Sequence, residues 1–449
     1  MTRTHHDAPV HDLVVAGFGP AGISIAVAAV DHDEAQPAGA PPLDAVYLER
    51  ARDSAWQPNL VLPGTDIQHH FLRDFATPRD PRSRFTFPNY LLSTGRFYPF
   101  TLLGGYASRE EWSAYVEWTA REVARPVAYH REVVEIAPVT DADGVVRAAE
   151  VTSVDVRDGS RHTHFGRNVA ISTGHLPYVP RLFEPSLGER VFHASRFLPR
   201  LAALPEGPLR YAVVGAGQTA GEIMLHLAAR HPDNEIFSLT RGHGIRMYEL
   251  GHFSNEVYFP QETDYFYALP RAEREQALDQ VRATNYAAVD PDVSTALYQA
   301  VYQDRLSGRG RWHMLNRTAV TGLKAPEGGD GTSGGVHLEL AEVHTGRTDA
   351  LDVDAVILCT GYTEPRLPAQ LDPFRDHLLT DEAGDPLVTR AYRAQTRDDC
   401  EVGIYLNGMT EWRHGISSAT SFSVMAVKAD VIHRDLRERL AARSGEAER

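Results

Sequence analysis

The sequence predicts an α/β protein made of two Rossmann-like dinucleotide-binding domains with a mostly helical insertion. Two glycine-rich segments carry this prediction, HDLVVAGFGPAG and LRYAVVGAGQTAGE, and each follows an apolar β-type run and precedes a helix-compatible stretch. Glycines at such a turn let backbone N–H groups approach a pyrophosphate at a helix N-terminus. We therefore expect two dinucleotides in one chain, FAD and a reduced nicotinamide.

The first unit contains the expected FAD site. Its fingerprint glycines are Gly17, Gly19 and Gly22, and the segment DAVYLER is typical of a second strand that ends at Glu49. An acidic side chain at this strand end commonly binds the ribose hydroxyls of an adenine dinucleotide. The alternative for Glu49 is an ordinary surface carboxylate.

The second unit contains the expected nicotinamide site. Its fingerprint includes Gly215, Gly217 and Gly221, and the segment NEIFSLTR is typical of a second strand that ends in Arg241. An arginine in this position accommodates the 2′-phosphate of NADPH, where an acid would instead bind a ribose hydroxyl. The prediction is therefore NADPH, and the alternative for Arg241 is a solvated surface arginine.

These motifs predict the division of the chain. Residues 1–205 are expected to form the first part of the FAD domain. Residues 206–345 are expected to form the NADPH domain, with a helical substrate-binding segment over about 245–316. Residues 346–449 are expected to return to the FAD domain and end in a helix, and the apolar strand and small-residue turn within 352–365 are assigned to that return.

Three segments between the motifs carry local signals. Residues 56–100 interleave aromatic and basic residues with prolines, which is typical of a loop that covers a ligand. A helix is expected from Ser108, with Glu111 in the capping-box position and its aromatics, such as Trp112, in the core. Alternation from Arg131 to Gly174 predicts a β-meander.

Composition limits the functional classes. The 449 residues carry a net charge of −15, which disfavours nucleic acid and anionic membranes as partners. No apolar run is long enough to span a bilayer. The only cysteines, Cys359 and Cys400, give no CxxC pair, disulfide framework or metal cluster, so we expect no metal and a reducing, cytoplasmic location. A disulfide reductase would need a redox cysteine pair beside the flavin, so an oxygen-using monooxygenase is favoured.

Several further segments resemble one family. They are IQHHFLRDFATPRDPRSRFTF, GAGQTAGE, FSNEVYFP, TNYAAV, ILCTGY and TEWRHGISS. Together with the first fingerprint, these segments resemble the motifs of the microbial N-hydroxylating flavoprotein monooxygenases, which are the L-lysine N6-hydroxylases and L-ornithine N5-oxygenases of siderophore and related pathways. The resemblance covers nearly the whole chain.

The resemblance implies roles for residues near the cofactors. Gln68 would lie near the flavin ring, and Gln218 and Thr219 belong to the NADPH motif of the family. Arg241 coincides with the position of the family's 2′-phosphate ligand, in agreement with the strand-end argument.

The resemblance also implies substrate-binding residues. Asn255 resembles the asparagine that binds the amino-acid end of the substrate, and Asn285 resembles a second asparagine that contacts the substrate and the nicotinamide cofactor. Ser417 matches the closing serine near the substrate. Either asparagine alone would be interpreted as a turn or cap residue.

The chain departs from the family pattern at four positions. Arg73 stands where the family usually has the lysine that pairs with the substrate α-carboxylate. An arginine can hold both carboxylate oxygens, but its reach and geometry differ. His69 and His70 replace small or apolar residues, and Gln57 stands where many members have histidine. These departures leave the choice among lysine, ornithine and another amine open.

The implied reaction is N-hydroxylation of a small-molecule primary amine. In the family NADPH reduces FAD, O₂ adds to give a flavin hydroperoxide, and one oxygen passes to the neutral amine. The family also implies a homo-oligomer, a dimer or a tetramer.

Three alternatives remain at this point. The first is N-hydroxylation of a diamine or other primary amine. The second is a Baeyer–Villiger or S-oxidising flavin monooxygenase, since FHASRF contains an HxxxF pair at His193 and Phe197, although the preceding FxG of that fingerprint is absent. The third is a non-catalytic nucleotide-binding sensor, which retention of both fingerprints disfavours.

Overall fold

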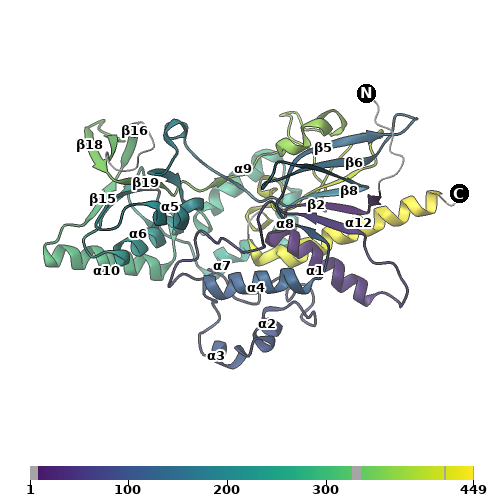
Figure 1. Cartoon of the computed structure of the whole chain (residues 1–449), viewed down its shortest axis with the longest axis horizontal. Helices are drawn as coiled ribbons and strands as arrows, with labels where there is room; N and C mark the ends of the chain where they lie inside the picture. Colours follow the sequence, from purple (N-terminus) through teal and green to yellow (C-terminus); the bar gives the residue numbers. More distant parts are fainter. Residues whose placement is uncertain (1–8, 326–334, 419–420, 448–449) are drawn as a thin grey trace.

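The computed structural model describes residues 9–325, 335–418 and 421–447, and it has two lobes (Figure 1). The lobes correspond to two separate sheets, one around the first glycine fingerprint and one around the second. The chain passes between them at β9 (Leu176–Pro177) and β20 (Tyr362–Thr363), which pair antiparallel to form a two-stranded link.

The first lobe is built on a six-stranded sheet. In spatial order its strands are β21 (Arg393–Ala394), β22 (Gly403–Leu406), β8 (Asn168–Ile171), β2 (Leu13–Ala16), β3 (Ala45–Leu48) and β4 (Val127–Ala128). All neighbouring pairs are parallel except β21 with β22. The central strands are buried along their whole length, as expected for a parallel sheet that is covered on both faces.

One face of this sheet carries helices and the other carries a second sheet. The helices of the lobe are α1 (Pro20–Ala35), α2 (Phe87–Ser93), α3 (Phe97–Thr101), α4 (Arg109–Glu122) and α12 (Met425–Ala447). The second sheet is a meander of β5 (Arg131–Thr140), β6 (Val146–Asp155) and β7 (Arg161–Gly166), with β1 (Val10–His11) at its edge. Helices α1 and α12 lie side by side, so the C-terminal helix packs on the first helix of the chain (Figure 1).

The second lobe is a five-stranded parallel sheet with helices and a small sheet around it (Figure 1). In spatial order its strands are β10 (Val191–His193), β19 (Ala355–Leu358), β11 (Arg210–Val214), β12 (Glu235–Thr240) and β15 (Trp312–Asn316). Its helices are α5 (Phe197–Ala203), α6 (Gln218–Arg230) and α10 (Pro291–Ser307). The small antiparallel sheet consists of β16 (Thr318–Lys324), β17 (Val336–Glu342) and β18 (Thr348–Val353).

A helical segment lies between the lobes. It consists of β13 (Arg246–Met247), α7 (His252–Asn255), α8 (Pro260–Ala268), α9 (Arg271–Val281) and β14 (Ala288–Val289). Helices α8 and α9 contact α11 (Glu411–His414) of the first lobe, and β14 contacts α6 of the second. This segment therefore bridges the two sheets.

Predictions that depend on residues close together in the sequence agree with the structure. Ser108 caps α4 by accepting a hydrogen bond from the Glu111 backbone N–H at 3.1 Å. Trp112 and Tyr115 of the same helix are fully buried in the first lobe. The meander forms over Arg131–Gly166, whereas the last strand of the predicted stretch, β8, joins the parallel sheet between β2 and β22.

The placement of three later elements differs from expectation. The strand within 352–365 was expected to return to the first lobe, but β19 lies in the second sheet, between β10 and β11. Helix α10 packs on α6 and β15 pairs with β12, so the inserted helical segment ends before α10 rather than at 316. An apolar four-residue strand suits either sheet equally, and only its partners decide between them.

Two features are absent from the described residues. Within them, no helix is both long enough and apolar enough to cross a membrane. The same part of the chain has no group of three or more His, Cys, Asp or Glu side chains arranged to hold a metal ion.

The cap of α4 is testable. Replacing Ser108 by Ala removes the acceptor for the Glu111 N–H, and we expect the protein to lose about 1 kcal/mol of stability and to unfold at a lower temperature. Ser108→Asp, which keeps an acceptor oxygen, should unfold close to the wild-type temperature. A thermal melt that shows no difference between the Ala and Asp variants would contradict the cap.

Candidate active site

The first fingerprint forms a tight turn between β2 and α1. Gly17 has a φ of +99°, and a Cβ added there would overlap the carbonyl oxygen of Ser172. A Cβ at Gly22 would overlap the carbonyl oxygen of Gly17, whereas Gly19 has no heavy atom within 4 Å of that position. Two of the glycines therefore permit the turn itself, and Gly19 leaves open space at the start of α1.

Glu49 follows β3 at the edge of this turn. Its two carboxylate oxygens accept backbone N–H groups of Phe18 and Ala51, each at 2.7 Å. The carboxylate is thus fixed beside the fingerprint, and each oxygen can still accept another hydrogen bond.

The second fingerprint repeats this geometry between β11 and α6. Gly215 has a φ of +138°, and a Cβ there would overlap the carbonyl oxygen of Cys359 in the turn after β19. Gly217 precedes α6 without a side-chain cap, and Gln218 and Thr219 begin the helix. The unsatisfied N–H groups of this first turn and the helix dipole together favour an anion.

Arg241 directly follows β12 and is exposed. Its guanidinium forms no hydrogen bond or ion pair with another of the described residues. It thus carries an uncompensated positive charge at the strand end that follows the second fingerprint.

Gln68 lies in the irregular segment before α2 and faces the second lobe. Its backbone is left-handed, with a φ of +59°, and its N–H donates to the Asp66 carboxylate at 3.0 Å. The Gln68 side-chain amide donates to the Asp290 carboxylate, which precedes α10, at 2.7 Å. The structure thus brings Gln68 to the junction of the two lobes.

Arg73 is a half-buried cation on the same segment. Its guanidinium donates to the Ser423 hydroxyl at 2.8 Å and lies 6.0 Å from the ring centroid of Tyr258. The neighbouring His69 ring packs between Trp112 and Phe422. Burial lowers the pKa of His69 to about 4, so this imidazole is neutral near pH 7 and adds no charge beside Arg73.

The two predicted asparagines lie on the bridging segment. Asn285 follows the turn that contains Thr284, and the Thr284 carbonyl accepts the Tyr258 hydroxyl at 3.0 Å. Tyr258 is also the tyrosine whose ring centroid lies 6.0 Å from the Arg73 guanidinium. The Asn255 amide donates to the carbonyls of Glu249 and Gly251 at 3.3 and 3.2 Å. Its N–H groups therefore stabilise its own segment.

Ser417 lies in the loop that precedes α12. It is 1% exposed, and its hydroxyl lies 3.4 Å from that of Thr263 on α8. Since Ser423 from the same loop contacts Arg73, this loop meets both the irregular segment and the bridging helices. The short helix Glu256–Tyr258 also contacts the short helix Ile416–Ser418, so Tyr258 lies near the segment that contains Ser417 as well as near Arg73.

The chain matches one family over most of its length. The model of the L-lysine 6-monooxygenase/L-ornithine 5-monooxygenase family matches residues 9–364. The chain belongs to this family. Among curated relatives, an L-ornithine N(5)-monooxygenase of Pseudomonas aeruginosa is 33% identical over 98% of this chain and 96% of its own length.

Solved structures of family members superpose closely on this monooxygenase. An L-lysine 6-monooxygenase from Pseudomonas syringae is 41% identical, covers 96% of this chain and 99% of its own, and has a TM-score of 0.84. An ornithine N-hydroxylase from Kutzneria sp. 744, solved with reduced FAD, NADP⁺ and L-ornithine, is 31% identical, covers 96% and 100%, and has a TM-score of 0.88. The predicted family, fold class and monooxygenase activity are confirmed.

Polar atoms near the first fingerprint suit a bound flavin nucleotide. The Asn407 amide nitrogen donates to the Ala21 carbonyl and the Ser172 hydroxyl at the fingerprint, at 2.8 and 3.1 Å. Asn407 Oδ1 and the Thr410 hydroxyl are buried without a partner among the described residues. Buried polar groups are normally satisfied, so these two suit a polar ligand.

Two charged side chains near the loop before α12, one buried and one half-buried, were missed from the sequence. The Lys428 ammonium, 2% exposed, donates to the Ser418 carbonyl at 2.9 Å, and burial lowers its pKa to about 8. The Glu411 carboxylate accepts the Tyr286 hydroxyl, and burial raises the pKa of Glu411. The partner of Glu411 is 125 residues away, and Lys428 donates to the loop before its own helix, so no local motif marks either residue.

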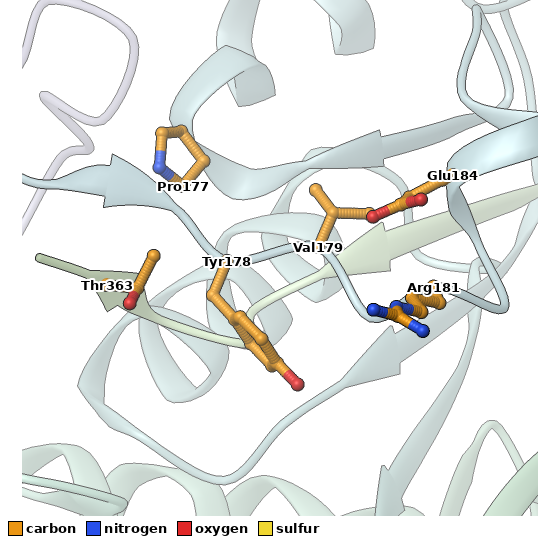
Figure 2. Close-up of a pocket in the computed structure, with 6 residues that line it drawn as sticks. All are labelled: Pro177, Tyr178, Val179, Arg181, Glu184 and Thr363. Carbon is orange, nitrogen blue, oxygen red and sulfur yellow. The ribbon is translucent and has the colours of Figure 1, made fainter. Parts of the chain in front are cut away.

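A cavity of about 590 Å³ lies where the chain passes between the lobes. Figure 2 shows its lining, which comes from the segment around β9 and from Thr363 in β20. Arg181 and Glu184 supply its charges. None of the predicted site residues lines it, so this cavity is separate from the region around Arg73.

Gly22 and Gly19 are expected to differ in their effect on protein stability, although both lie at the FAD site. Gly22→Ala introduces an overlap with the Gly17 carbonyl, so we expect a lower melting temperature of the apoprotein and loss of bound FAD. Gly19→Ala meets no heavy atom, and the φ of Gly19 is −76°, so the apoprotein should melt normally while FAD binds more weakly. Melting and FAD titration test this, and equal melting temperatures for the two variants would refute it.

Proposed function

We propose that this chain uses NADPH, FAD and O₂ to hydroxylate the terminal side-chain amine of L-lysine or L-ornithine. The observation that carries the proposal is the position of Arg73, a half-buried cation oriented by Ser423 and Tyr258. A guanidinium so oriented can hold both oxygens of an α-carboxylate. Asn285 and Ser417 then bind the rest of the amino acid.

The two fingerprints supply the cofactor sites of this proposal. FAD binds at Gly17, Gly19 and Gly22 with Glu49 on its ribose, and NADPH binds at Gly217 with Arg241 on its 2′-phosphate. When bound, the cofactors supply the electrons and activate oxygen. The role of the protein is to orient both cofactors, to exclude water and to bind the amine in its neutral, reactive form.

The amine must be neutral to attack an electrophilic oxygen. A lysine side chain in water has a pKa of about 10.4, so it is charged at neutral pH. Ser417 and Thr263 are 1% and 2% exposed, and an amine bound beside residues so far from water would lose hydration of its charged form, which lowers its pKa. The hydroxyl oxygens of Ser417 and Thr263 can accept hydrogen bonds from the N–H groups of a neutral amine.

The substrate is determined by product analysis. NADPH oxidation and hydroxylamine formation are measured with lysine, ornithine, cadaverine and putrescine. The 41% identity to the Pseudomonas syringae lysine enzyme makes lysine the first amine to test. Hydroxylamine from lysine or ornithine supports the proposal, whereas turnover of the diamines alone would contradict it.

The Baeyer–Villiger alternative finds no support at His193. One ring nitrogen of His193 lies 3.0 Å from the Gly361 carbonyl and the other lies 3.0 Å from the Ser195 hydroxyl. Both nitrogens thus serve the local structure at the end of β10. Assay of a ketone substrate alongside the amines tests this alternative.

The role of Arg241 gives a prediction about cofactor preference. Arg241→Ala should remove a charge-assisted contact with the 2′-phosphate, costing about 1.5–3 kcal/mol of binding. The KM for NADPH should rise, while the KM for NADH, which lacks this phosphate, should change little. Equal effects on both cofactors would exclude the assignment.

The role of Arg73 gives a prediction about substrate binding. Arg73→Ala should weaken amino-acid binding by roughly 2–5 kcal/mol, because the substrate carboxylate is buried unpaired. The same variant should lose little affinity for cadaverine, and Arg73→Lys should recover part of the lysine activity. Normal turnover of lysine and ornithine by Arg73→Ala would show that the carboxylate binds elsewhere.

A further inference from the structure

A closed ring of polar contacts joins the two lobes beside the fingerprints. It crosses the junction twice and contains three residues from each side. The first lobe contributes Asp66, Gln68 and Arg109, and the second contributes Gln218, Glu222 and Asp290.

The first crossing is a buried ion pair. The Arg109 guanidinium, at the start of α4, donates to both Glu222 carboxylate oxygens on α6, at 2.9 and 2.8 Å. The side chains are 7% and 2% exposed. A buried bidentate pair accepts one relative orientation of its partners, because separating them leaves an unpaired charge away from water.

The second crossing is the contact between Gln68 and Asp290. The Gln68 amide donates to the Asp290 carboxylate at 2.7 Å. Gln218 connects this crossing to the first, since its amide nitrogen donates to Glu222 at 3.0 Å and its amide oxygen accepts the Asp290 backbone N–H at 2.8 Å. Every polar atom of the Gln218 amide is thus oriented by the ring.

Asp66 closes the ring within the first lobe. Its carboxylate accepts the Gln68 backbone N–H at 3.0 Å, and its carbonyl accepts the Arg109 guanidinium at 3.5 Å. Arg109 also donates to the Leu60 carbonyl at 3.0 Å. These contacts connect the irregular segment and α4 to each other and to α6.

We propose that this ring sets the position of the NADPH unit relative to the flavin unit, and that Glu222 and Asp290 are positioning residues for hydride transfer. The inference rests on the proposed function, because Gln68 and Gln218 are the residues assigned to the flavin side and the nicotinamide side. The ring orients both amides through the same two carboxylates. Loss of either contact between the lobes, Arg109 with Glu222 or Gln68 with Asp290, is therefore expected to change the distance between the two cofactors.

The ring also makes this positioning pH-dependent. Burial, together with the neighbouring acids Asp66, Asp292 and Glu222, raises the pKa of Asp290 to about 6 against the opposing effect of the Gln68 amide. Tyr248 also faces this carboxylate. Above pH 6 the ionised carboxylate accepts the Gln68 amide strongly. Below pH 6 the protonated group loses this charge-assisted contact.

The main test separates flavin reduction from oxygen chemistry. In Glu222→Gln, which keeps the side-chain size but loses the charge, anaerobic reduction of bound FAD by NADPH should slow roughly tenfold. Chemically reduced enzyme should still react with O₂ and lysine at the wild-type rate. FAD content is measured in each preparation.

Asp435→Asn is the matched control. Asp435 on α12 pairs with Arg393 in the same two-contact geometry, at 2.8 and 3.3 Å, but both residues belong to the first lobe. This variant should lose stability without slowing reduction by NADPH. Equal slowing in both variants, or normal reduction in Glu222→Gln, would overturn the proposal.

A second variant keeps the inference testable if Glu222→Gln does not fold. The wild-type reduction rate should rise with pH through about 6, and Asp290→Asn should remove that step. Retention of the step in Asp290→Asn would overturn the inference. A wild-type enzyme that NADPH does not reduce would instead refute the proposed function.

Discussion

The buried pair of Arg109 and Glu222 is the interaction on which the arrangement of the two lobes depends. Each lobe has its own sheet, but Leu60 and Leu62 of the first lobe's irregular segment are buried in the core of the second lobe. Apolar contact therefore joins the lobes, and it has little directional preference. The buried charge pair adds that direction, because a displacement that separates the pair leaves an ion uncompensated away from water.

Much of this structure could be predicted because its determinants are short-range. The turns at Gly17 and Gly215 need a residue without a Cβ, and the sequence shows such residues at the right spacing after apolar runs. The cap at Ser108 and the alternating strands of the meander depend on neighbours within a few residues or one hairpin. The family motifs also suggested Gln68, Asn285 and Ser417, and their assignment to the site stays a prediction.

The features that escaped prediction depend on partners distant in the chain. The strand at 355–358 is apolar and could join either sheet, and only its pairing with β11 places it in the second. Arg109 and Glu222 each lie on a helix where a charged residue is unremarkable, and their contact spans 113 residues. Lys428 likewise resembles an ordinary helical lysine until the fold encloses it. Single-sequence patterns carry no information about such pairings.

The packing of α12 against α1 has a consequence for the order of folding during synthesis. The sheet of the second lobe uses only residues 191–358, so it can close as soon as that stretch has left the ribosome. The first lobe begins with β2 but lacks β22 and α12 until the last fifty residues are made. Its early strands therefore lack their partners β22 and α12 while the second lobe already has every strand of its sheet, so the lobe that begins first in the chain is the one completed last.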